Sequence, residues 1–253
     1  MKIFDKIIEA TWQHFYEIEG KEFVVPNSIP ILFFGNIKKY FNSPLKIITV
    51  AKNPSHNEFP EGFKRFNTDR LSLKKNDVYL DTLSEYFDRS PLFEWFNHFE
   101  KLLQHLDASY YDEDYPMLKG KITFDWKPQI NCALHTDICS PIATNPTWTK
   151  LDKKQQEQLQ VYGKILWHKL VEILEPDLIL LSCAEKHKDA LNLPEQSWNN
   201  IDLSADIKKR HKLKVADFNS AKAFWISANI PPISMKDVDL PHVAKKIRGI
   251  SSD

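Results

Sequence analysis

Residues 178–183 read LILLSC and predict a strand less ambiguously than any other stretch of the chain. A strand that is apolar on both sides of its pleat is typical of a parallel sheet with helices on both faces. A long helix is predicted just before it, over 151–174, because Pro176 is a strong stop signal. A short helix is predicted after it, over 184–191. This helix–strand–helix unit indicates an α/β fold.

The same alternation extends outward from this unit in both directions. Further strands are predicted at 46–51, 129–134 and 222–228, and further helices at 2–18, 77–88, 91–106 and 236–248. Strands that alternate with helices give a parallel sheet covered on both faces. We therefore expect a three-layer α/β/α sandwich around a short parallel sheet, as a single domain over 1–253. A boundary near 110–120 is conceivable, but the alternation runs through it.

The composition excludes several classes of protein. Six glycines occur, and the closest pair is 15 residues apart, so neither GxGxxG nor GxxxxGK can be written. Three cysteines without a CxxC offer no cysteine-based zinc site and fit a reducing, cytoplasmic compartment. The amino terminus carries charges through its apolar run and lacks a small-residue cleavage site, so we expect no signal peptide. No apolar run approaches the ~20 residues that span a bilayer.

The charge balance bears on partners. Lys plus Arg is 34 and Asp plus Glu is 34, which gives a formal net charge of zero. Bulk charge therefore cannot hold a polyanion, although a local basic face can. The basic run 208–212, together with Lys236, Lys245, Lys246 and Arg248, is either a solvated face or a phosphate-binding side.

Three asparagines lie at or near the ends of predicted strands, where ligands bind in parallel α/β sheets. Asn53 stands in AKNPSHN (51–57), Asn131 in INCALHTD (130–137) and Asn229 in ANIPPIS (228–234). Each side-chain amide offers two donors and one acceptor, which suits a water or an amide-like ligand edge. Phe66 lies thirteen residues past Asn53.

This ordered set of motifs over roughly 44–240 resembles the uracil-DNA glycosylase superfamily, and LILLSCAEKHK resembles that family's third strand and following helix. The resemblance implies that Asn53 positions the hydrolytic water and that Phe66 stacks on an extruded base. It implies that Asn131 reads the base edge and that Asn229 supports the leaving base or the strand. His56 is expected to steady the water or a phosphate.

The resemblance also implies a substrate, a partner and further contacts. The expected activity is hydrolysis of the N-glycosidic bond of a deaminated or modified pyrimidine in DNA, by a monomer without a cofactor, a metal or a membrane. Substrate contacts are expected from Pro54, Ser55, Pro231 and Ser234, in addition to Phe66 and Asn131.

Two departures from the family pattern matter. Ala51 stands where the family usually has glycine, and the final loop has neither His nor a Pro-Ser directly after Asn229. Asparagine in both motifs resembles the mismatch-specific branch. A neutral amide orients a water but cannot take its proton, so the reaction would be fairly dissociative and rely on electrostatic positioning. A non-catalytic binder of nucleic acid or nucleotide on the same fold is the alternative.

Each of these residues also has a structural interpretation. Asn53 and Asn229 stand near prolines and fit ordinary turns. Phe66 is one of 16 phenylalanines and fits a packing role, and a buried Asn131 commonly satisfies backbone groups.

Other residues near these strand ends suggest two further chemistries. His56, His135 and Asp137 could form a metal set or an acid/base pair, and His-x-Asp on an extended segment places both side chains on one face. Positioning near Asn131 or plain surface polarity is the simpler interpretation of these three residues. A hydrolase with Cys139 or Ser140 as nucleophile lacks a G-x-S-x-G elbow.

Overall fold

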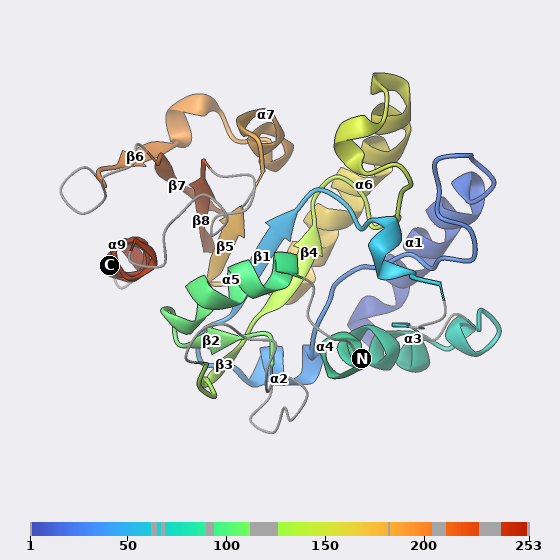
Figure 1. The fold of residues 1–253 in the computed structure, drawn as a ribbon, viewed down its shortest axis with the longest axis horizontal. Coiled ribbons are helices and arrows are strands. Elements are labelled where there is room, and N and C mark those ends of the chain that lie inside the picture. The colour runs from blue at the N-terminus through green and yellow to red at the C-terminus, as the bar shows by residue number, and fades with distance from the viewer. Residues whose placement is uncertain are drawn as a thin grey trace. The chain divides into compact units, whose positions relative to one another are not determined.

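The computed structural model describes residues 2–61, 65–66, 69–89, 94–111, 126–181, 183–203, 211–227 and 239–251 (Figure 1). The helices are α1 (Asp5–Ile18), α2 (Ile37–Asn42), α3 (Asn76–Ser84), α4 (Tyr86–Arg89), α5 (Glu94–Gln104), α6 (Lys153–Leu174), α7 (Glu185–Lys188) and α9 (Leu240–Ser251). The strands are β1 (Ile47–Ala51), β2 (Ala108–Ser109), β3 (Asn131–Cys132), β4 (Leu134–Asp137), β5 (Leu178–Leu181), β6 (Asn199–Ile201), β7 (Leu213–Phe218) and β8 (Ala221–Ile226). Within the described ranges, every helix is too short or too polar to span a lipid bilayer.

The main sheet has six strands in the order β4-β1-β5-β8-β7-β6. Strands β1, β5 and β8 run parallel, with Ile48 opposite Ile179 and Ile179 opposite Ala223. These three side chains are fully buried. The protein is thus a mixed α/β fold with a mostly parallel central sheet and helices around it, which confirms the predicted fold class.

One edge of the sheet corrects the expectation of an all-parallel sheet. Strands β6 and β7 are antiparallel additions, β7 to β8 and β6 to β7. A tight turn at Asn219 and Ser220 joins β7 to β8, and Asn219 adopts φ 54°. Asparagine tolerates this left-handed conformation because its short side chain can bond locally. Strand β7 was not predicted from the sequence, because it contains polar residues and follows a basic run.

The strand predicted at 129–134 also needs correction. The structure has two short strands there: β3 pairs with β2, and β4 joins the main sheet. All four residues of β4 are buried, although His135, Thr136 and Asp137 are polar. The carboxyl end of the strand in the main sheet is therefore Asp137, several residues after Asn131.

Backbone contacts divide the chain into two compact units, each built from three separate segments. One unit, called unit 1, comprises 1–37, 51–89 and 135–174, and unit 2 comprises the rest. The single-domain expectation stays a prediction.

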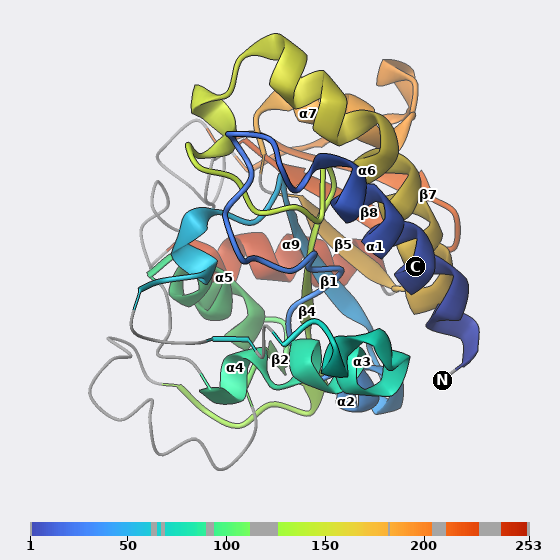
Figure 2. The same ribbon diagram turned by 90° about the vertical axis from the view of Figure 1, so that its right-hand side faces the viewer.

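In unit 1, α1 runs along α6 (Figure 2), and the His14 ring lies 5.2 Å from that of Tyr162. Gly163 of α6 meets the chain that follows β4 so closely that a Cβ there would lie 2.0 Å from the carbonyl oxygen of Cys139. Unit 2 contains β5 to β8, and its helices α5 and α9 are in contact.

Candidate functional site

The side chain of Asn53 is fixed by three hydrogen bonds just past the end of β1. The two hydrogens of its Nδ2 are shared among three acceptors, which are the carbonyl oxygens of Pro54 (2.7 Å) and Ile142 (3.2 Å) and the Thr144 hydroxyl oxygen (2.9 Å). These contacts orient the amide, because only its nitrogen can donate. In the part of the chain that the structure describes, no donor reaches the Asn53 Oδ1. The half-buried amide therefore presents an oriented acceptor.

The backbone of the loop that follows is pinned to Thr144. The Thr144 N–H donates to the Pro54 carbonyl over 3.2 Å, and the His56 N–H donates to the Thr144 carbonyl over 3.1 Å. Ser55 begins a short 3₁₀ helix, His56–Glu58, and its hydroxyl accepts from the Asn57 N–H. Pro54 is buried, Ser55 is half-buried and the His56 side chain is exposed.

Glu58, at the end of this 3₁₀ helix, is a buried carboxyl group that the sequence did not single out. It accepts a hydrogen bond from the Tyr86 hydroxyl. Burial raises the pKa of Glu58 from its ordinary value of 4.5 to about 7, and the charge of Asp137 adds to the rise. The Tyr86 hydrogen bond and the buried Arg65 act in the opposite direction. In the folded chain Glu58 is therefore protonated below about neutral pH.

His135 and Asp137 come together on one face of β4, as the His-x-Asp spacing predicts. The His135 Nε2 lies 3.7 Å from the Asp137 Oδ1, and both side chains are buried. The alternative of plain surface polarity is therefore wrong for this pair. Within the described ranges no hydrogen bond reaches the Asp137 Oδ1. His56, being exposed, does not complete a cluster with them, and the described residues contain no group of three or more ligands placed to hold a metal ion.

Phe66 lies in a cluster of aromatic rings with 1% of its surface exposed. Its ring centroid lies 5.2 Å from that of Tyr86 at an interplanar angle of 29°, and 5.6 Å from that of Phe59 at 32°. The Phe34 ring lies 6.3 Å away. The packing interpretation fits this arrangement, and a base could stack on Phe66 only if a neighbouring ring moved.

Asn131 holds two backbone groups of unit 2. Its Oδ1 accepts from the Leu45 N–H over 2.9 Å, and its Nδ2 donates to the Asp107 carbonyl over 2.9 Å. Leu45 precedes the amino end of β1, whereas ligands of parallel sheets bind at carboxyl ends. The expected position of Asn131 at a carboxyl end is therefore wrong, because the apolar run around it is not the strand that enters the main sheet.

The predicted final loop lies outside the described residues, and this covers Asn229, Pro231 and Ser234. The same holds for Lys236 and for most of the basic run, Lys208, Lys209 and Arg210. Among the basic residues of α9 that are described, Arg248 forms an ion pair with Asp107 at 2.9 Å and donates to the His105 carbonyl.

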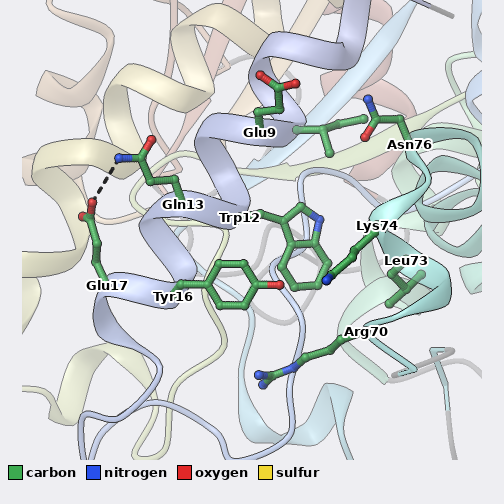
Figure 3. A pocket seen from close by; sticks show the side chains of 10 residues that line it. Glu9, Trp12, Gln13, Tyr16, Glu17, Arg70, Leu73, Lys74 and Asn76 are labelled. Carbon is green, nitrogen blue, oxygen red and sulfur yellow. Dashed lines mark hydrogen bonds between the residues drawn. The ribbon is translucent and has the colours of Figure 1, made fainter.

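A separate cavity of about 580 Å³ lies in unit 1, between α1 and residues 70–76. Figure 3 shows Trp12 and Tyr16 pointing from α1 toward the segment that carries Arg70 and Lys74. Two acidic residues of α1, Glu9 and Glu17, also line it. Because its walls combine both signs of charge, the cavity does not select a charged ligand by sign.

No protein-family model and no curated protein sequence matches this chain. The likeness to uracil-DNA glycosylases therefore rests on the motifs quoted above. Sequence reasoning missed Glu58, Arg65 and Tyr86. The only local signal was a charged residue, Glu58, directly after the Asn53 motif.

Proposed function

We propose that the chain is a DNA glycosylase-like hydrolase that cleaves the N-glycosidic bond of a deaminated or modified pyrimidine. The observation that carries the proposal is the oriented amide of Asn53. Three acceptors hold its nitrogen, so its oxygen can accept a hydrogen bond from a water and fix the direction of that water's lone pair. Fixing a nucleophile in this way removes much of the entropic part of the barrier.

The position of Asn53 supports this role. It follows the carboxyl end of a strand in a mostly parallel sheet, which is where such folds bind their ligands. Its loop ties β1 to the chain that follows β4, through Pro54 and Thr144. A rigid loop keeps a bound water in one place, because its backbone cannot relax away from the reacting atom.

The substrate-binding part of the proposal differs from the family pattern. Phe66 and Asn131 contact protein groups in the ligand-free chain, so base recognition would require rearrangement or other residues. Phe59 is half-buried and packs on Phe66, which makes it a second ring that an extruded base could meet. Extrusion costs a few kcal/mol and least for a mismatched or single-stranded base.

The test is a single-turnover base-release assay over a panel of oligonucleotides that contain uracil, thymine mismatches and other modified pyrimidines. We expect Asn53→Ala to lower the release rate by about 10²–10⁴-fold, which is typical for a lost positioning or acid/base group. Oligonucleotide affinity should change little, because the water is not a ground-state DNA contact. Asn57→Ala is the matched control, because Asn57 is an exposed asparagine in the same loop, and it should release base at the wild-type rate.

The alternative is a non-catalytic nucleic-acid or nucleotide binder on the same fold. Phe66 is buried and the Asn131 amide is hydrogen-bonded to backbone groups, so neither side chain is available to contact an extruded base, which favours this alternative. A chain that binds the panel but releases no base from any member would establish this alternative and refute the hydrolase.

A further inference from the structure

Asp137 and the Asn53 loop lie at the carboxyl ends of two neighbouring strands, in unit 1. Asp137 is the last residue of β4, and the next residue, Ile138, donates its N–H to the Ala51 carbonyl over 3.0 Å. Ala51 is the last residue of β1, two positions before Asn53. A backbone hydrogen bond therefore joins the carboxyl ends of β1 and β4. Asn53 comes from the loop after β1, and the carboxylate of Asp137 comes from the end of β4.

The Asp137 carboxylate is buried without the hydrogen bonds that a structural carboxylate needs. Asp137 is 6% exposed, and no donor in the described part of the chain reaches its Oδ1. The His135 Nε2, at 3.7 Å, is too distant for a hydrogen bond. An unsatisfied buried oxygen costs free energy, and such groups concentrate where a ligand or a water completes them.

Glu100 in unit 2 shows what a structural buried carboxyl group looks like in the same protein. It is fully buried, and its oxygens accept from the Ser109 hydroxyl, the Tyr110 N–H, Gln104 and Trp126. Those donors leave little capacity for a ligand. The Oδ1 of Asp137, by contrast, keeps its capacity to accept a proton or a hydrogen bond.

The groups around Asp137 suit different chemical roles for two carboxyl groups, those of Glu58 and Asp137. Glu58 interacts electrostatically with Asp137, the His135 Nε2 lies 3.7 Å from the Asp137 Oδ1, and the charge of Arg65 acts on Glu58. Because burial raises the pKa of Glu58 to about 7, Glu58 is protonated below about neutral pH and then places no negative charge beside Asp137. In many active sites two carboxyl groups differ in protonation because their surroundings differ, and one then serves as the acid and the other as the base.

We propose that Asp137 is the general base of this site, an inference that rests on the proposed hydrolase function. The oxygen of the water held by Asn53 bonds to C1′ of the deoxyribose, and the C1′–N bond breaks with its electron pair on the base nitrogen. The water's proton passes to the Asp137 carboxylate. The products are an abasic deoxyribose and a base anion that takes a proton from solvent. Asp137 thus supplies the proton acceptor that an asparagine cannot be.

The experiment measures single-turnover base release from an oligonucleotide that the wild-type chain cleaves. We expect Asp137→Asn to lower the rate by about 10²–10⁴-fold with unchanged oligonucleotide affinity. The substitution preserves shape and removes no hydrogen bond among described residues. Asp81→Asn is the matched control, because Asp81 is an exposed aspartate of unit 1 on α3, and it should retain the wild-type rate.

A second measurement uses the wild-type chain alone and so does not depend on how the variants fold. If a carboxylate takes the water's proton in the rate-limiting step, release should be slower in D₂O than in H₂O. Equal rates in the two solvents, or wild-type release by folded Asp137→Asn, would overturn the role of Asp137. Wild-type chain that releases no base refutes the hydrolase itself. Release that Asn53→Ala impairs and Asp137→Asn spares refutes only the present inference.

Discussion

The buried carboxyl group of Glu58 gives the protein a specific dependence of stability on pH. Burial raises its pKa from 4.5 to about 7, so the folded chain holds this proton more tightly than the unfolded chain does. Its contribution to the free energy of unfolding is full below about pH 4.5 and is lost as the pH rises through about 7. At about 1.4 kcal/mol per pKa unit, the loss amounts to about 3 kcal/mol.

Glu58→Gln isolates this contribution, because glutamine has the same shape and no charge at any pH. We expect the stability of the variant relative to wild type to rise by about 3 kcal/mol between pH 4 and pH 8. Urea unfolding at several pH values measures the difference, and groups such as Glu100 cancel because both chains carry them. Glu61→Gln, an exposed neighbour, should give a curve parallel to wild type.

Parallel stability curves for wild type and Glu58→Gln would refute the reasoning. They would mean that Glu58 is ionised in the folded protein at neutral pH. Glu58 would then carry a negative charge beside Asp137, although the hydrogen-bond argument for Asp137 would be unaffected.

Two further predictions test the packing of unit 1. Phe66→Ala should lower the free energy of unfolding by about 3–5 kcal/mol in urea titration, because it empties a site enclosed by Phe34, Phe59 and Tyr86; a loss under about 1 kcal/mol would favour the stacking role instead. Gly163→Ala should cost about 1–3 kcal/mol or more in thermal unfolding, because the added Cβ meets the Cys139 carbonyl at 2.0 Å. Gly249→Ala is its control, with nothing within 4 Å of the added carbon.

Most helices and the inner strands could be predicted from the sequence because their signals are local. Within the run predicted over 178–183, Leu178–Leu181 form β5, and the run ending at Ala51 forms β1. The helical spacing of 2–18 and the stop at Pro176 place α1 and α6 within a few residues. A strand that is buried on both faces is a continuous apolar run, and a proline lacks the N–H that would extend a strand. Both signals lie within a few residues of the element they define, so the sequence alone shows them.

The sheet edge and β4 could not be predicted in the same way. Strand β4 is made of Leu134, His135, Thr136 and Asp137, and its polar side chains look like a loop until the surrounding elements bury them. Strand β7 pairs with β8 across a two-residue turn at Asn219 and Ser220, and this short polar sequence also suits many other loops. Strand β4 pairs with β1, which lies far away in the sequence, so composition along the chain does not fix that pairing.

The candidate site divides along the same line. The sequence by itself determined that Asn53 follows a buried strand, because Pro54 cannot continue the ladder. Only the tertiary structure decided that Phe66 is packed, that Asn131 holds backbone groups, and that Glu58 and Asp137 are buried near each other. A carboxyl group's protonation depends on how much water every neighbouring element excludes and on which charges remain close. Both are sums over segments far apart in the sequence, so they exist only once the chain has folded.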